Sequence, residues 1–279
     1  MKIKCFLALL LCFIAIKEAI RRGGLITMIH TMLFIFAYFL LFFIIGTIRK
    51  NNSIVDIGWG LGFVAVAWDI LLITDEIKLS QWLIVLCVST WGLRLFIHIY
   101  KRNKGKPEDF RYAAWRREWG KWLIPRSFFQ IYMLQAFFMF IIALPIIFTR
   151  YINDEVQLGI LIIGFLIWIT GFCFEVVSDN QLRVFLKKQE NRGKLMMDGL
   201  WRFTRHPNYF GEATLWWGIY LMALSLGVPV LTIISPITIT VLLVFVSGIP
   251  LLENSMKNKP EYQEYAEKTS IFIPWFPKK

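Results

Sequence analysis

Long apolar runs alternate along this chain with polar connections. A helix of about 20 apolar residues crosses the hydrocarbon core of a bilayer. Runs of that length cover residues 25–48, 54–73, 80–100, 127–149, 156–177, 208–227 and 229–252. Short connections at 74–79, 150–155 and near Gly227 alternate with long polar ones at 101–126 and 178–207. The pattern predicts an all-α, polytopic membrane helix bundle with about seven transmembrane helices, forming one membrane-embedded domain over residues 28–279.

Residues 1–27 depart from this pattern. Their apolar run, 5–16, is too short to cross a membrane and lies between basic residues, as in the apolar core of a signal peptide. No convincing small-residue cleavage site follows it, and Arg21 and Arg22 break the charge pattern of the remaining chain. We therefore interpret residues 1–27 as an N-terminal extension or signal-like segment that carries no catalytic residue, with Met28 as a candidate natural start.

The distribution of charge along the chain predicts how the helices are oriented in the membrane. Lys and Arg concentrate in the 101–126 and 178–207 connections and in the tail after Glu253, which predicts that these segments are cytoplasmic. We expect an integral protein of a bacterial inner membrane. The formal net charge of +12 follows largely from this asymmetry. Because no nucleic-acid motif accompanies it, we expect the lipid bilayer as partner and no nucleic acid. The four cysteines lack paired spacing and the three histidines are scattered, so no metal site is predicted.

The densest polar cluster, Thr204 to Glu212, opens the sixth apolar run. Pro207 fits the first turn of a helix, and the free N–H groups of a helix start favour an anion. Arg205, His206 and Asn208 would supply further donors. A stripe at three- and four-residue steps, made of Arg205, Asn208, Tyr209, Glu212 and Trp216, would line one side of a pocket. The alternative is a snorkelling arginine, a helix cap and a structural proline.

Further polar residues lie at the membrane boundary. Asp179 and Arg183 are four residues apart, which suits either a surface ion pair or the same pocket. Trp201 and Arg202 suit a flat heterocycle and a phosphate, and equally lipid headgroups. Arg94, about two turns inside the third span, either meets an anion or snorkels. Asp56, in the second span, is likewise an ionisable residue within an apolar run, so it too is either a functional residue or one that reaches the membrane boundary.

Gly58, Gly60 and Gly62 follow Asp56 in the second span at two-residue steps. Because glycine has no Cβ, these residues favour close packing of this helix against a neighbour.

Several of these segments together resemble a known family. The motif from Trp201 to Glu212, the preceding Ser178, Asp179 and Arg183, the Arg94–Pro107 segment and the Glu261–Pro277 tail resemble the bacterial DUF1295 proteins, relatives of the steroid 5-alpha-reductase and sterol-reductase superfamily. The resemblance implies a seven-helix bundle that encloses NADPH from the cytoplasmic side and reduces a carbon–carbon double bond of a hydrophobic, lipid- or steroid-like substrate.

The resemblance also implies site residues. The cofactor contacts it implies are Arg94, Asp179, Arg183, Trp201, Arg202, Arg205, Asn208, Tyr209 and Glu212, with Tyr262, Tyr265 and Lys268 of the tail closing the pocket. Where the steroid reductases carry a catalytic tyrosine, this chain has Trp91, which we assign to the substrate pocket. Asp56 is a loose counterpart of the carboxylate that partners that tyrosine. The cofactor site therefore transfers better than the proton-donor chemistry.

Two other functions stay open. One is an S-adenosylmethionine-dependent membrane methyltransferase of the isoprenylcysteine or phospholipid type, because such enzymes share the Arg-His-Pro-x-Tyr helix start; Gly211, Glu212 and the Ser178–Arg183 segment favour the reductase. The other is a noncatalytic lipid-binding or transport protein, although the chain shows no internal repeat that would support transport.

Overall fold

The computed structural model describes residues 24–151, 155–259 and 261–278, and among these there are helices and connections but no β-strand. The all-α prediction is confirmed. The chain forms two compact units, here called unit 1 (residues up to 157, and 223–235) and unit 2 (158–222, and 236–279). The prediction of a single domain over 28–279 stays a prediction, and most of the N-terminal extension lies outside the described residues.

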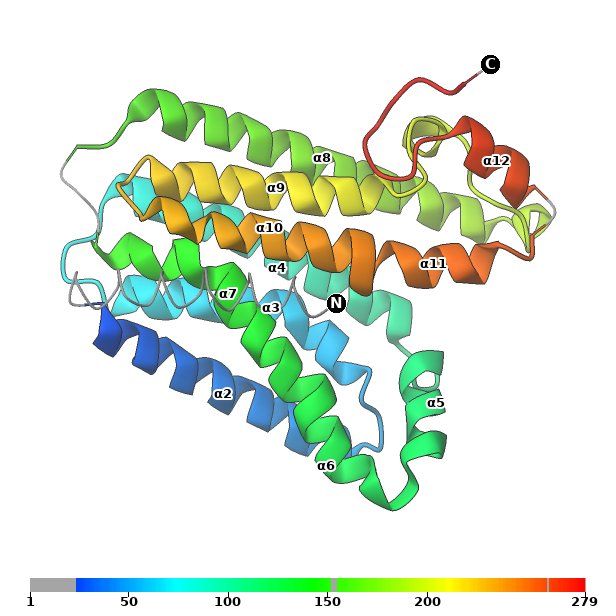
Figure 1. Cartoon of the computed structure of the whole chain (residues 1–279), viewed down its shortest axis with the longest axis horizontal. Coiled ribbons are helices and arrows are strands. Elements are labelled where there is room, and N and C mark those ends of the chain that lie inside the picture. The colour runs from blue at the N-terminus through cyan, green and yellow to red at the C-terminus, as the bar shows by residue number, and fades with distance from the viewer. Residues whose placement is uncertain (1–23, 152–154, 260, 279) are drawn as a thin grey trace. The chain divides into compact units, whose positions relative to one another are not determined.

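Unit 1 is a group of long apolar helices with a helical hairpin-like segment at one end (Figure 1). Helix α3 packs against α2, α4 and α7. The α-helices are α2 (Leu25–Ile48), α3 (Ile54–Leu72), α4 (Leu79–Asn103), α5 (Phe110–Trp119), α6 (Leu123–Ser127) and α7 (Leu134–Phe148). Short 3-10 turns occupy Gly120–Trp122, Thr149–Tyr151 and Val230–Ile233, and a π-helical stretch, Phe128–Met133, continues α6 into α7.

Helices α3 and α4 meet at a pair of glycines. A Cβ on Gly60 would lie 2.6 Å from the carbonyl oxygen of Gly92, and one on Gly92 would lie 2.5 Å from that of Gly60. Only glycine allows two helix backbones to approach this closely. The close packing predicted from Gly58, Gly60 and Gly62 is therefore confirmed, with Gly60 at the closest approach.

The 101–126 connection is helical, although the sequence pattern marked it only as a long polar loop. Its acidic residues fasten α5 to the turn between α2 and α3. The N–H of Asn52 donates to Oε1 of Glu108 over 2.6 Å, and the N–H of Asp109 donates to Oγ of Ser53 over 2.7 Å. Asp109 also caps the start of α5 by accepting from the N–H of Arg111.

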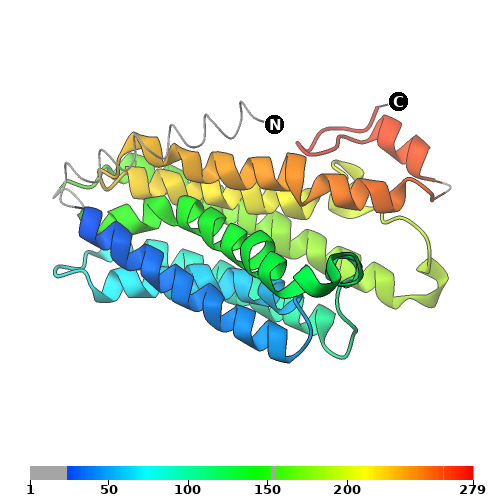
Figure 2. The ribbon, with the colours of Figure 1, turned by 60° about the horizontal axis from the view of Figure 1, so that its bottom comes forward.

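Unit 2 contains α8 (Leu158–Lys187), α9 (Pro207–Leu224) up to Met222, α10 (Ile234–Val241) from Pro236, α11 (Ile249–Met256) and α12 (Tyr262–Lys268). Two 3-10 turns, Gln189–Asn191 and Gly199–Arg202, lie in the connection between α8 and α9. A π-helical stretch, Leu242–Val246, precedes the break at Gly248, so the last apolar run is a bent helix (Figure 2).

Helices α8 and α9 pack backbone to backbone through two glycine pairs. A Cβ on Gly211 would lie 2.6 Å from the carbonyl oxygen of Gly171, and one on Gly218 would lie 2.7 Å from that of Gly164. On each helix the two glycines are seven residues apart, or about two turns, so they lie on the same face, and this face contacts the other helix. This contact holds the start of α9, with its polar motif, against the polar end of α8.

Six helical segments of the described chain are long and apolar enough to cross a membrane: Leu25–Ile48, Ile54–Leu72, Leu79–Asn103, Phe110–Tyr151, Leu158–Lys187 and Val230–Met256. The protein is an integral membrane protein. Helix α9 forms where the sixth span was predicted, at 208–227, but it is not among these six segments. The bundle of about seven predicted helices thus agrees closely with the structure.

Candidate functional site

The polar motif of unit 2 forms the start of α9 as the sequence predicted, with Pro207 as the first helical residue. Asn208, next in the chain, joins α9 to α8, because its Nδ2 donates to Oδ1 of Asp179 over 3.2 Å. Its Oδ1 accepts from the N–H of Tyr209. Two residues from the predicted cofactor set, Asn208 and Asp179, are therefore in direct contact.

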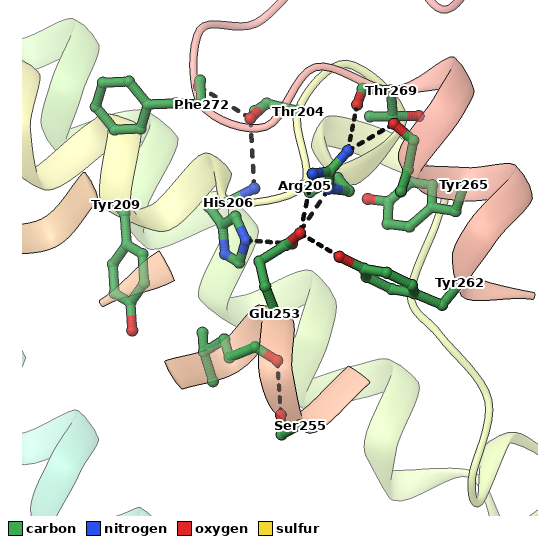
Figure 3. A network of polar contacts seen from close by, with 12 residues as sticks. Thr204, Arg205, His206, Tyr209, Glu253, Ser255, Tyr262, Tyr265, Thr269 and Phe272 are labelled. Atoms are coloured by element: carbon green, nitrogen blue, oxygen red, sulfur yellow. Dashed lines mark hydrogen bonds and ion pairs between the residues drawn. The ribbon is translucent and has the colours of Figure 1, made fainter. Parts of the chain in front are cut away.

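Arg205 lies inside the protein and is held by the chain itself. Its side chain donates through Nε and Nη2 to the two carboxylate oxygens of Glu253, over 3.1 and 2.9 Å. Its Nη1 donates to the carbonyl oxygens of Ala266 and Thr269, over 2.8 and 2.9 Å. The residue is 7% exposed. Figure 3 shows this guanidinium enclosed between α11 and the tail.

Glu253, which the sequence did not single out, is the centre of this network. Besides Arg205, its carboxylate accepts hydrogen bonds from Nε2 of His206, over 2.8 Å, and from the hydroxyl of Tyr262 (Figure 3). Two oxygens thus bind three side chains from two segments of the chain, the α9 motif and α12. The available signal was an acidic residue immediately after the last apolar run, because a carboxylate placed there needs a partner.

The tail attaches to the motif at further points. The hydroxyl of Thr204 donates to the carbonyl oxygen of Phe272 over 2.9 Å, and the N–H of Arg205 donates to that of Ser270 over 2.8 Å. Tyr265 donates to the carbonyl oxygen of Trp201. Trp201 in turn donates through Nε1 to the carbonyl oxygen of Ser178 on α8. The tail, the motif and α8 therefore form one hydrogen-bonded assembly within unit 2.

Burial controls the charges of this network. It lowers the pKa of His206 below the usual histidine value, so the ring is neutral near pH 7 and donates to Glu253. Burial also raises the pKa of the Tyr262 phenol to about 12, so this hydroxyl keeps the proton that it donates. One positive charge, on Arg205, balances one negative charge, on Glu253. Because each buried charge has a hydrogen-bonded counter-charge, the pair can lie inside the protein.

Other predicted residues of unit 2 face solvent or lie at its edge. Arg183, Arg202 and Lys268 are exposed, while Tyr209 and Glu212 are half-buried on α9. Nη2 of Arg183 donates to Oδ1 of Asn180, and Nζ of Lys268 donates to Oε1 of Glu264. The ring of Tyr209 stacks on that of His206, which ties it to the Glu253 network.

Three predicted residues belong to unit 1 and are described within it. Asp56, in the first turn of α3, accepts from the hydroxyl of Tyr112 over 2.6 Å and from Nη2 of Arg111 over 2.9 Å. Trp91 is fully buried on α4 against the ring of Phe63. Arg94 is half-buried one turn further along α4. Their predicted roles stay predictions, as do those of the residues in unit 2.

Comparison with known proteins gives this site a family context. A protein of the fission yeast Schizosaccharomyces pombe, "Uncharacterized protein C594.04c", is 24% identical over 270 residues, which is 84% of this chain and 78% of that protein. Mouse 3-oxo-5-alpha-steroid 4-dehydrogenase 1 is 34% identical over 79 residues, or 28% of this chain and 31% of the mouse protein. The human protein of the same name is 35% identical over 75 residues, or 27% of this chain and 29% of its own length.

These matches are local in the mammalian proteins, of which the aligned part covers less than a third. No solved structure matches the chain significantly. The relatives named here are eukaryotic, so a bacterial origin stays an expectation. The model of the family described as "Protein of unknown function (DUF1295)" matches residues 42–269, which include the α9 motif, Glu253 and all of α12. Since this is most of the chain, the protein belongs to the DUF1295 family, with local similarity to steroid 5-alpha-reductases.

Proposed function

We propose that the protein is a membrane reductase that uses NADPH to reduce a carbon–carbon double bond of a hydrophobic, lipid- or steroid-like substrate. The observation that carries the proposal is the local similarity to 3-oxo-5-alpha-steroid 4-dehydrogenase 1 in a chain of the DUF1295 family. In this reaction NADPH would supply a hydride to the double bond. The apolar helices give a hydrophobic substrate access from the bilayer.

The residues of unit 2 suit a phosphate-bearing cofactor. Residues 178–207 contain seven Lys and Arg against three Asp and Glu. Arg183 and Arg202 are exposed and so are open to a ligand, and cations of this kind bind phosphates well. S-adenosylmethionine carries a sulfonium cation and no phosphate, so a surplus of cations favours NADPH over this alternative cofactor.

Within this proposal Arg205 is a positioning residue. Its four side-chain hydrogen bonds end on Glu253, Ala266 and Thr269, so its guanidinium fixes the tail to the start of α9. The direct phosphate contacts are assigned to Arg202 and Arg183, and the polar parts of the cofactor to Asn208, Tyr209 and Glu212. His206 orients Tyr209 through the ring stack. Tyr262, Tyr265 and Lys268 then act through the tail.

Ligand binding to the purified full-length protein tests the proposal. We expect binding of NADPH, weaker binding of NADH, which lacks the 2′-phosphate, and no binding of S-adenosylmethionine. Binding of S-adenosylmethionine alone would assign the protein to the methyltransferases. Binding of neither would favour the noncatalytic lipid-binding or transport function.

A pair of variants separates contact from positioning. Arg202→Gln should weaken NADPH binding on the order of tenfold with little change in NADH binding, because a charge-assisted hydrogen bond is worth roughly 1.5 to 3 kcal/mol. Lys187→Gln, which removes the same charge from the exposed end of α8, is the matched control and should change NADPH binding little. Equal losses in both variants would contradict a specific contact at Arg202.

A further inference from the structure

A cavity of about 210 Å³ lies within unit 1, where the turn between α2 and α3 meets the α5–α6 segment. We call it the turn cavity. Its walls come from three parts of the chain: Thr47 at the end of α2 with Lys50 and Asn52 of the turn, Arg116 of α5, and Leu123, Ile124 and Ser127 of α6. The proposed reductase function uses none of these residues.

The turn cavity has a positive surplus. The side chain of Lys50 is exposed and, within the described ranges, makes neither an ion pair nor a hydrogen bond. Arg116 pairs with Glu108 through Nε and Nη2, over 2.7 and 2.8 Å. Its Nη1 has no hydrogen-bond partner among the residues that the structure describes. Two cations against one carboxylate leave one net positive charge. Two sets of N–H donors, Nζ of Lys50 and Nη1 of Arg116, remain for an anion.

The inner wall of the cavity is polar and fixed. Asn52 and Ser127 are both buried, and Nδ2 of Asn52 donates to Oγ of Ser127 over 3.2 Å. The amide oxygen of Asn52 accepts from the hydroxyl of Tyr132. Oγ of Ser127 therefore serves as an acceptor, and in the described part of the chain its own proton has no acceptor. A buried hydroxyl with a free donor at the wall of a cationic cavity is suited to bind a phosphate oxygen.

Part of the cavity lining is apolar, because Leu123 and Ile124 belong to it. Ile124 is 57% exposed, and the nearby residues Trp122 and Phe129 in the chain are 58% and 66% exposed. Tryptophan and apolar side chains beside cations are typical of the membrane interface, where headgroup and acyl chain meet. A free phosphate ion would gain nothing from these side chains, whereas the acyl chains of a lipid would cover them.

We propose that the turn cavity binds the phosphate of an anionic phospholipid, with Lys50, Arg116 and Ser127 on the headgroup and the exposed apolar side chains against its acyl chains. The bound lipid would join the α2–α3 turn to the α5–α6 segment. This site is distinct in its residues from the proposed cofactor site, so failure of one proposal leaves the other intact.

Native mass spectrometry of the full-length protein, titrated with phosphatidylglycerol and separately with zwitterionic phosphatidylcholine, tests the site. We expect one phosphatidylglycerol to be retained in preference to phosphatidylcholine. Lys50→Gln should weaken its binding about fivefold, since one cation near a membrane surface contributes on the order of a tenfold factor or less. Lys121→Gln is the matched control, because Lys121 is exposed on the same segment but does not line the cavity.

A second variant tests the cavity independently of charge. Thr47→Trp fills the space from an exposed helical position and should abolish the retained lipid while Lys50 is intact, with the thermal midpoint checked for folding. Equal weakening by Lys50→Gln and Lys121→Gln would overturn the site in favour of a diffuse basic surface. Displacement of the lipid by millimolar inorganic phosphate, with phosphate itself retained, would overturn the lipid in favour of a soluble phosphate.

Discussion

At the residue scale, the Glu253 carboxylate is the group on which the site of unit 2 most depends. Glu253→Gln would leave the guanidinium of Arg205 buried without its counter-charge, and removing one partner of a buried pair costs about 3 to 5 kcal/mol. We expect a clearly lower thermal midpoint and faster proteolysis of the tail after Met256. Glu264→Gln, which removes an exposed partner of Lys268, should leave both measurements unchanged. A wild-type midpoint in Glu253→Gln would disprove the central role of this carboxylate.

The neutral state of His206 gives a second prediction at this scale. Because burial lowers its pKa in the folded protein, the unfolded chain takes up a proton first as the pH falls. The contribution of neutral His206 to the free energy of unfolding should therefore be fully present above the unfolded pKa of about 6.5. It should decrease as the pH falls from there to the lower native pKa, with a slope of at most about 1.4 kcal/mol per pH unit.

Thermal midpoints between pH 5 and 8 measure this dependence. His206→Gln keeps a donor toward Glu253 but cannot titrate, so it should lose this part of the slope. Glu253, Arg205 and Tyr262, the charged and titratable groups around the ring, are present in both proteins and cancel in the comparison. Parallel curves for the two proteins would argue against a buried neutral histidine.

At the scale of elements, the contact between α8 and α9 depends on glycine. Gly211→Ala would place a Cβ 2.5 Å from the backbone nitrogen of Glu175, so the helices must separate. Overpacking of this kind costs about 1 to 3 kcal/mol. We expect a lower midpoint and weaker NADPH binding, because Asn208 and Glu212 move with α9. Gly159→Ala, on the same α8 but with no atom near its Cβ, should have neither effect.

The elements themselves were largely predictable from apolar periodicity. The run 25–48 has the same bounds as α2, and Pro207 marked the first residue of α9 correctly. The α5 helix was missed because its charged and aromatic residues give no apolar stripe. The break at Gly248 was also missed, since apolar composition continues through it and only the backbone geometry of a π-helical stretch reveals it.

At the scale of the whole molecule, the site shows where sequence reasoning stops. The tail was expected to close over the motif, and Tyr262 and Tyr265 do contact its surroundings. Glu253, the residue that makes this possible, is 48 positions from Arg205, and pairing over such a separation leaves no local pattern. A buried arginine and an exposed one also look alike in sequence, so the burial of Arg205 against Glu253 could not be predicted, and its predicted cofactor contact stays a prediction.

The number of membrane crossings gives the last prediction. If α9 crosses the membrane, the chain crosses seven times, and the connections 101–126 and 178–207 share the cytoplasm with the tail. If only the six most apolar helices cross, the tail lies on the opposite side from the 178–207 connection. Since Lys and Arg are abundant in all three segments, we expect seven crossings.

Single cysteines at Lys104, Arg192 and Lys278, introduced after replacement of the four natural cysteines, distinguish these topologies. A membrane-impermeant thiol reagent added to intact cells should label none of the three, and all three should react once the membrane is opened. A cysteine at Asp75, in the short connection between α3 and α4, is the control that should react in intact cells. Labelling at Lys278 but not at Arg192 would instead make α9 a helix that enters the protein without crossing the bilayer. Both ends of its polar stripe would then have to be reached from the same side of the membrane.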